Sequence, residues 1–162
     1  MYKTTLKKLI NKILYSLNPV TPIKTVCLFI DEFTDYNDTE TGIKAIKLLT
    51  ALGYEVITVN NEVSARTYIS KGFLRKAGKT IRKNITLFSK IINEDLPLIG
   101  IEPSCILGFR DEYPDLAGAD MREQALKLAG NCFLIDEFIA REFRAGRITR
   151  GDFCDSPKEI ML

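Results

Sequence analysis

The residues with the most distinctive chemistry in this chain of 162 residues are its four cysteines, Cys27, Cys105, Cys132 and Cys154. No two of them form a Cys-x-x-Cys pair, so the sequence does not support a zinc knuckle. The chain has no histidine, which excludes Ser-His-Asp and Cys-His catalysis and every zinc site that uses imidazole. Cys27 and Cys132 lie among apolar residues and are predicted to pack in the core, whereas Cys154 lies in a polar tail that allows exposure.

Cys105 has the sequence context with the most chemical interest. It lies in "IGIEPSCILGF" (99–109), where an apolar run stops at Glu102-Pro103. Proline suits the first turn of a helix, and the positive end of the helix dipole favours the thiolate form of a nearby cysteine. A single cysteine at the start of an apolar helix is nevertheless more often a small buried residue, and residue type alone favours that interpretation.

The rest of the chain alternates between short apolar runs and helical patterns. Strands are predicted at 24–30, 55–60 and 97–102, and helices at 39–54, 69–95, near 120–129 and near 134–146. The long helix is expected to bury Phe73 together with Ala77, Ile81, Ile85, Phe88 and Ile92, and the last residues, "EIML", are compatible with a further strand. This order predicts a three-layer, Rossmann-like α/β domain in which helices flank a parallel sheet of at least three strands.

The N-terminal segment has the pattern of an amphipathic helix. Residues 4–17 place leucines and isoleucines on one stripe and lysines elsewhere, and Asn18-Pro19 ends the pattern. We expect residues 1–20 to form a connector helix that packs on a single α/β domain at 21–162. A membrane-surface or partner-docking helix is the alternative.

The loops after the three strands are the expected place for a site, because ligands of parallel sheets bind outside the carboxyl ends of the strands. These loops, 31–40, 60–72 and 102–105, should share one rim, and their candidate side chains are Glu32, Ser64, Arg66, Lys71, Glu102 and Cys105. The acidic run 31–40 suits a divalent cation, or more simply a solvated loop in which Asp38 or Thr39 caps the next helix. The basic residues of 66–90 suit an anion, or the solvated face of a helix. Neither a dinucleotide-binding glycine motif after the first strand nor a P-loop is present.

The composition limits the classes of partner. A formal net charge of +2 is too small to indicate nucleic-acid binding. Hydrophobic residues make up 46% and charged residues 27%, as in globular proteins, and no apolar run reaches the length of a membrane span. The start of the chain does not read as a signal peptide, so we predict a cytoplasmic protein without disulfides and find no sequence support for membrane association.

Three segments carry a more specific likeness: "LFIDEFTDYNDTETGIKAIKLLTALGYEV", "SARTYISKGFLRKA" and "IGIEPSCILGFRDEYPDL". Together they resemble the cysteine-rich CCG domain of iron–sulfur oxidoreductases, a family that includes the B subunit of heterodisulfide reductase and the C subunit of anaerobic glycerol-3-phosphate dehydrogenase. The likeness covers about residues 24–143. It is greatest to the C-terminal region of FAD-linked oxidases of the D-lactate or glycolate dehydrogenase type.

The resemblance implies a site whose cysteines are mostly replaced. Family members hold iron–sulfur clusters with thiolates on this rim, whereas this chain has Glu32-Phe33, Ser64-Ala65-Arg66 and Glu102 at the matching places. Only Cys105 remains as an implied metal ligand, and one thiolate cannot hold a cluster that normally takes four. Ser64 and Glu102 are poor substitutes because their oxygens are hard donors for soft iron.

The implied function is an electron-transfer or docking module of a FAD-linked 2-hydroxy-acid oxidoreductase, and the isolated chain is not expected to be catalytic. A cluster is expected only in a longer protein, with FAD in a partner domain and no cofactor in this chain alone. The implied partners are an FAD-binding oxidase domain and a ferredoxin-like domain, and the chain is expected to be part of a larger protein. The first alternative is a non-redox domain that binds a protein partner or a small anion near Arg66 and Lys71. A receiver-like domain ranks last, because the third strand ends in Glu102-Pro103 and not in a phosphorylatable Asp.

Overall fold

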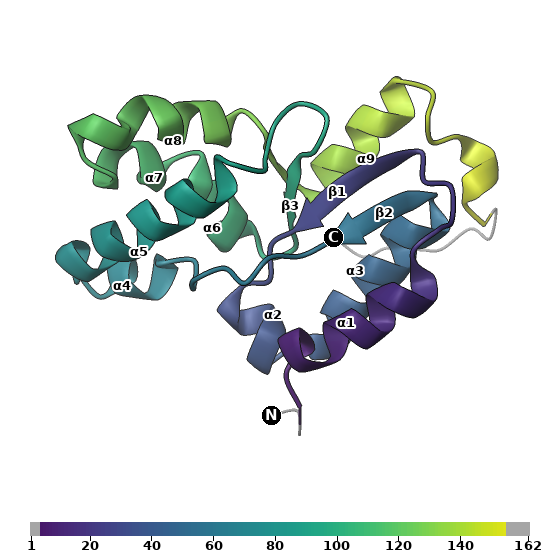
Figure 1. Cartoon of the computed structure of the whole chain (residues 1–162), viewed down its shortest axis with the longest axis horizontal. Helices are drawn as coiled ribbons and strands as arrows, with labels where there is room; N and C mark the ends of the chain where they lie inside the picture. Colours follow the sequence, from purple (N-terminus) through teal and green to yellow (C-terminus); the bar gives the residue numbers. More distant parts are fainter. Residues whose placement is uncertain (1–3, 155–162) are drawn as a thin grey trace, which may run out of the picture.

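The computed structural model describes residues 4–154, and its centre is a sheet of four parallel strands in the order β2-β1-β3-β4. The strands are β1 (Lys24–Leu28), β2 (Tyr54–Ile57), β3 (Leu98–Gly100) and β4 (Cys132–Leu134). The helices are α1 (Leu6–Leu17), α2 (Glu32–Tyr36), α3 (Thr39–Ala51), α4 (Arg66–Ser70), α5 (Leu74–Phe88), α6 (Pro103–Ile106), α7 (Glu112–Leu116), α8 (Arg122–Ala129) and α9 (Ile135–Arg144). The prediction of an α/β fold with a parallel sheet between helices is confirmed (Figure 1).

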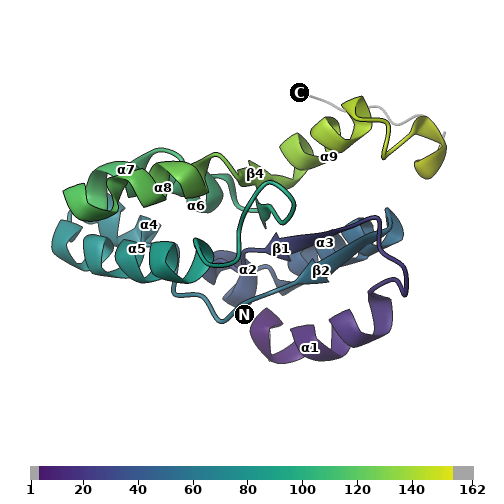
Figure 2. The same ribbon diagram turned by 45° about the horizontal axis from the view of Figure 1, so that its top comes forward.

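The two faces of the sheet are covered by different sets of helices. Alternate residues of a strand point to opposite faces, so Cys27 packs with the apolar sides of α5 and α8, whereas Val26 and Leu28 pack with α1, α3 and α9. Figure 2 shows the α4–α8 group and α1 on opposite sides of the strands. Each layer therefore has its own apolar core, and the carboxyl ends of the strands remain free to carry loops.

Helix α1 packs on the domain through its apolar stripe, as predicted. Leu6 and Ile10 are buried against α3 and the sheet. The backbone N–H of Lys7 donates to Asp35 Oδ1 at 2.8 Å, which ties α1 to α2. Within the described part of the chain, no helix has the length and apolar character that crossing a membrane requires.

The predicted helix 69–95 is wrong in its extent. The chain forms two helices, α4 and α5, separated at Gly72, whose φ of +73° is costly for other residues. Helix α5 ends at Phe88, and Phe73, expected in the core, precedes the helix and is 54% exposed. The other five residues of that predicted face are buried.

Three short elements were not predicted, and one prediction lies outside the described residues. The elements β4, α2 and α7 have three to five residues each, too few for a periodic pattern to appear. The prediction that 31–40 is a solvated loop is therefore wrong in its first half, where Asp31, Thr34 and Asp35 are buried around α2. Asp38 caps α3 as expected. The strand suggested for "EIML" falls beyond residue 154.

Candidate functional site

The rim at the carboxyl ends of β1, β2 and β3 begins with Asp31, which caps α2. Its Oδ1 accepts hydrogen bonds from the backbone N–H groups of Phe33 and Thr34, and its Oδ2 accepts one from the Thr34 hydroxyl at 2.6 Å. Burial raises the pKa of Asp31, and these hydrogen bonds only partly offset that effect. Asp31 is therefore a structural cap, and it turns the chain so that Glu32 faces the loop after β2.

Glu32 joins the loop after β1 to the loop after β2. Its two carboxylate oxygens accept hydrogen bonds from Ser64, one from the backbone N–H at 2.9 Å and one from the hydroxyl at 2.8 Å. The Ser64 hydroxyl also accepts from the backbone N–H of Arg66 at 3.2 Å. Ser64 is only 2% exposed, so this pair satisfies polar atoms that water does not easily reach.

A buried network beneath Ser64 fixes the loop from the helical side. The Tyr113 hydroxyl donates to the Ser64 carbonyl at 3.0 Å and accepts from Asn84 Nδ2 at 3.0 Å. Asn84 also donates to the Val63 carbonyl. The next residue, Ala65, has φ +69°, a strained conformation for a residue with a side chain, and it is 1% exposed. The network thus holds a loop that would otherwise relax.

The loop after β3 supplies Glu102 and Cys105. Glu102 caps α6 by accepting from the backbone N–H of Cys105 at 2.7 Å, and it also accepts from the Ser104 hydroxyl at 2.8 Å. Burial opposes ionisation of Glu102, but these hydrogen bonds and the charge of Arg66 outweigh it, so the pKa of Glu102 is lowered. Glu102 is therefore a carboxylate near neutral pH.

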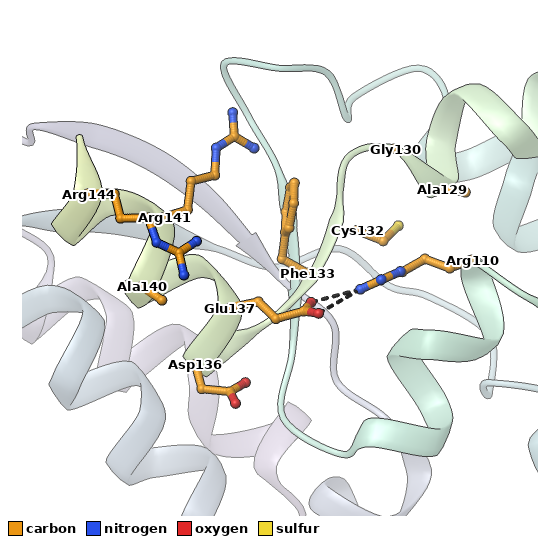
Figure 3. A pocket seen from close by; sticks show the side chains of 10 residues that line it. All are labelled: Arg110, Ala129, Gly130, Cys132, Phe133, Asp136, Glu137, Ala140, Arg141 and Arg144. Atoms are coloured by element: carbon orange, nitrogen blue, oxygen red, sulfur yellow. Dashed lines mark hydrogen bonds and ion pairs between the residues drawn. The ribbon is translucent and has the colours of Figure 1, made fainter.

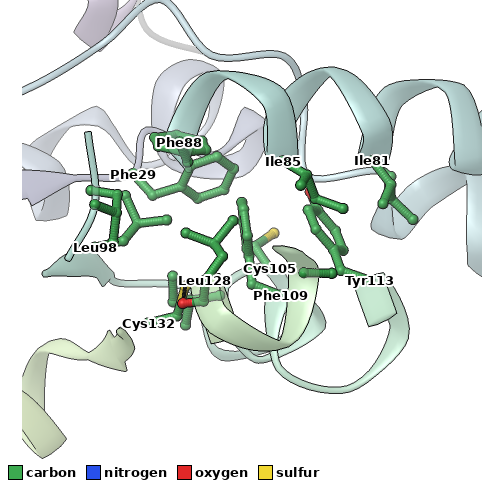
Figure 4. Close-up of a cluster of buried hydrophobic side chains, with 14 of the residues drawn as sticks. Phe29, Ile81, Ile85, Phe88, Leu98, Cys105, Phe109, Tyr113, Leu128 and Cys132 are labelled. Carbon is green, nitrogen blue, oxygen red and sulfur yellow. Dashed lines mark hydrogen bonds between the residues drawn. The ribbon is translucent and has the colours of Figure 1, made fainter. Parts of the chain in front are cut away.

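The Cys105 side chain lies in the core below the rim, beside Phe109 and Tyr113 (Figure 4). Burial raises the pKa of its thiol far above the ordinary range, and the Glu102 carboxylate adds to this effect. A hydrogen bond with Ser64 acts in the opposite direction, and the nearby charges of Asp31 and Glu32 raise the pKa further. The favoured interpretation of Cys105 as a small buried residue is confirmed. The alternative, a thiolate favoured by a helix dipole, finds no support, because α6 has four residues and desolvation dominates.

The structure brings four of the six candidate residues together at one rim: Glu32, Ser64, Glu102 and Cys105. Arg66 begins α4 beside them, with its side chain exposed. Lys71 is exposed at the end of α4, and within residues 4–154 no hydrogen bond or ion pair joins it to the rim.

The donors of the rim do not fit an iron–sulfur cluster. The neutral thiol is the favoured form of Cys105, and the oxygens of Glu32 and Glu102 accept hydrogen bonds from neighbouring residues. A cluster needs several thiolates, and no group of three or more cysteine, aspartate or glutamate side chains within residues 4–154 is arranged to hold a metal ion. The described residues therefore do not provide the ligand set that a cluster requires.

Sequence reasoning missed Asp31, Asn84 and Tyr113 as parts of the rim. Asp31 had a local signal, because an aspartate three residues before Thr34 is a typical helix cap. Asn84 lies in the middle of a helical pattern and Tyr113 in a short helix, and nothing in the sequence near either residue indicates its partner. Only the packing of α5 against α7 brings them together.

A second concave feature lies at the β4 side of the sheet. It is a cleft of about 620 Å³ between the end of α8 and one flank of α9 (Figure 3). Arg110 and Glu137 form a two-fold hydrogen-bonded ion pair across it, at 3.0 and 2.8 Å. No sequence pattern indicates this cleft, because β4, which borders it, was not predicted.

Comparison with known proteins relates the chain to parts of larger oxidoreductases. The chain is 28% identical over 116 residues to D-2-hydroxyglutarate dehydrogenase of Escherichia coli K12, and 26% identical over 141 residues to that of Pantoea ananatis. These alignments cover 72% and 86% of this chain. It is 30% identical over 97 residues, 59% of the chain, to the C subunit of anaerobic glycerol-3-phosphate dehydrogenase of E. coli K12.

The chain spans only a small part of these relatives. The alignments cover 11% and 13% of the two D-2-hydroxyglutarate dehydrogenases and 24% of the glycerol-3-phosphate dehydrogenase polypeptide. No protein-family model and no solved structure matches the chain. The comparisons thus relate this chain to one segment of larger oxidoreductases.

Proposed function

We propose that this chain is a non-catalytic docking part of a larger oxidoreductase that acts on a 2-hydroxy acid or a related alcohol. The observation that carries the proposal is the similarity of most of the chain to a small segment of two dehydrogenases with different names. In this proposal residues 1–20 are a connector and residues 21–162 form one α/β domain. FAD is bound by a partner domain, and an iron–sulfur cluster is present only where further segments of a longer protein supply its ligands. A ferredoxin-like domain is the other proposed partner, and the assembly is cytoplasmic.

The donor chemistry of the rim supports docking over electron transfer by this chain itself. A buried thiol with a raised pKa and carboxylates engaged in hydrogen bonds are suited to holding loops in place. Arg66 is exposed beside this ordered region, so a partner could meet a fixed surface with one cation. Ordered loops lower the entropic cost of docking.

Purification of the tagged chain from its native cells under anaerobic conditions tests the proposal. We expect a flavoprotein to co-purify and to reduce a dye with D-2-hydroxyglutarate, D-lactate, glycolate or glycerol 3-phosphate, while the chain alone has no turnover. Arg66→Ala should lower the yield of the complex, and Lys47→Ala, which removes an exposed cation from α3, should not. Recovery of the chain without flavin and without substrate-dependent dye reduction would refute the proposal.

A second candidate function rests on a pocket of about 150 Å³ beside the rim. Arg66, Ser64, Ser70, Ser104 and Glu112 are among the residues that line it. Arg66 and the Ser70 hydroxyl suit a small anion, whereas the Ser64 and Ser104 hydroxyls already donate to Glu32 and Glu102, and the Glu112 carboxylate limits the affinity. Titration calorimetry with phosphate and with D-lactate should show binding that Arg66→Ala removes and Lys71→Ala, outside the lining, retains. Absence of binding to the wild-type chain would reject this candidate.

A further inference from the structure

The two edges of the sheet differ in how they are covered. At the β2 edge, the side-chain amide of Asn18 donates to the Val56 carbonyl at 3.0 Å and accepts from the Val56 N–H at 2.9 Å. It thereby takes the place of a further strand. Within residues 4–154, β4 pairs only with β3, and its outer side borders the 620 Å³ cleft. The Leu134 N–H of β4 donates to Glu137 Oε2 at 3.0 Å, but within residues 4–154 no strand lies beside this edge. A strand edge without a neighbouring strand, next to a cleft, is a common place for contact with another chain.

Helix α9 presents a patterned face on this same side of the molecule. Asp136, Ala140 and Arg144 are spaced four residues apart, so they lie in a row along one flank of the helix, about 6 Å from one to the next. Asp136 and Arg144 are exposed, and Ala140 between them is half-buried. Figure 3 shows these three residues along α9.

The other charged side chains of the cleft already have partners in the chain. Glu137 is paired with Arg110, and the Arg141 guanidinium lies 5.0 Å from the centre of the Phe133 ring. Asp136 and Arg144 have no ion pair within residues 4–154. Next to them, Phe143 is 49% exposed, an unusual exposure for a large apolar side chain.

We propose that this face binds a second copy of the same chain in a two-fold dimer, with the two α9 helices antiparallel and crossing at Ala140. A two-fold contact requires a surface that is complementary to itself. The α9 face meets that requirement, because opposite charges lie at equal distances on either side of a small residue. Rotation about Ala140 places Asp136 of each copy against Arg144 of the other.

The packing of such a contact follows from the same residues. Ala140 has a side chain small enough for two helix axes to approach closely. The half-exposed Phe143 then loses water contact at the interface, which supplies the apolar contribution that surface ion pairs alone do not provide. The inference does not rest on the oxidoreductase relationship, because it uses only the α9 face and the β4 edge.

Charge exchange between the two positions gives a direct test by analytical ultracentrifugation of the full chain. The wild-type chain should form a dimer as its concentration is raised. Asp136→Arg and Arg144→Asp each replace two attractive pairs by two repulsive ones, and each should weaken dimerisation by about 10- to 30-fold. The double variant Asp136→Arg/Arg144→Asp should dimerise like the wild type, because the exchange restores both pairs.

A mixture of the two single variants provides the decisive measurement. One variant then has two arginines on the face and the other two aspartates, so the mixture should form heterodimers that neither variant forms with itself. Arg75→Asp, a charge reversal on the exposed side of α5, is the matched control and should dimerise normally. Circular dichroism checks that every variant is folded. A wild-type chain that is monomeric at all concentrations, or a mixture no more dimeric than its components, would overturn the proposal.

Discussion

Replacement of Glu32 tests whether the rim is held together by the side chains that connect its loops. Glu32→Ala removes both acceptors from the Ser64 N–H and hydroxyl, which the structure places at 2.9 and 2.8 Å. A buried donor that loses its partner costs about 1–3 kcal/mol. Because Glu32 itself is half-buried, water can replace part of the lost contact, and we expect the free energy of unfolding to fall by about 1–2 kcal/mol. Glu32→Gln keeps one acceptor and should cost roughly 0.5 kcal/mol.

The assay is urea unfolding followed by far-UV circular dichroism, since the chain has no tryptophan for fluorescence. A double-mutant cycle with Ser64→Ala isolates the pair, and a coupling of about 0.5 kcal/mol or more is expected for residues in direct contact. Glu123→Ala, on the exposed side of α8, serves as the matched control. If Glu32→Ala unfolds at the same urea concentration as this control, the loops are not held by this contact, and the account of the rim is wrong.

The burial of three side chains, and the pKa shifts of two of them, can be tested in solution. In the folded chain, a thiol reagent should modify the exposed Cys154, and Cys105 should react only after unfolding; rapid modification of Cys105 in the native state would contradict its burial. Glu142 is 1% exposed, and its pKa is lowered chiefly by Arg147. Its ionised form therefore stabilises the folded chain fully above the pKa of the unfolded state, and this stabilisation is lost as the pH falls through the pKa of the folded state. Glu142→Gln should therefore cost about 1–3 kcal/mol at neutral pH, with the difference from wild type shrinking below a pH of about 4 in urea unfolding. Asp31 has a raised pKa, so its ionisation costs stability at neutral pH. The Asp31→Asn variant keeps a cap acceptor, so it should be more stable than the wild type at neutral pH and lose that advantage in acid. A gain in stability of equal size at every pH would refute the assignment.

The fold could be predicted from the sequence wherever an element was long enough to show its period. The helical spacing of 39–54 predicted α3, and the continuous apolar run 24–30 predicted β1 as a strand covered on both faces. The break at Gly72 could not be placed by periodicity, because apolar residues on both sides of the break continue one helical spacing. Strand β4 is as short as β3, but it runs directly into α9 at Ile135, so no separate strand pattern stands out, and its pairing with β3 joins distant parts of the chain.

The candidate site shows a similar division between local and distant information. That the loops carrying Glu32, Ser64 and Glu102 would meet followed from the parallel order of the strands. The strand order does not predict the hydrogen bond between Glu32 and Ser64. This contact depends on Asp31, which turns the chain, and on Tyr113, which fixes the opposite loop. Apolar neighbours in the sequence did indicate the burial of Cys27, Cys105 and Cys132, but the groups that surround the Cys105 thiol, Glu102 and Ser64 among them, depend on the fold.

The loops of the rim are connected by carboxylates and hydroxyls, and this has a physical consequence. Several thiolates at one place repel one another and need a metal to neutralise them, whereas Glu32 and Ser64 are an acceptor and a donor that satisfy each other. Glu102 does the same with the N–H of Cys105 and the Ser104 hydroxyl. The polar groups of such a rim satisfy one another, so the order of its loops does not depend on a bound metal. Under the proposed docking function, contact with other chains is to be sought at the faces that remain exposed, Arg66 at the rim and the α9 flank beside β4.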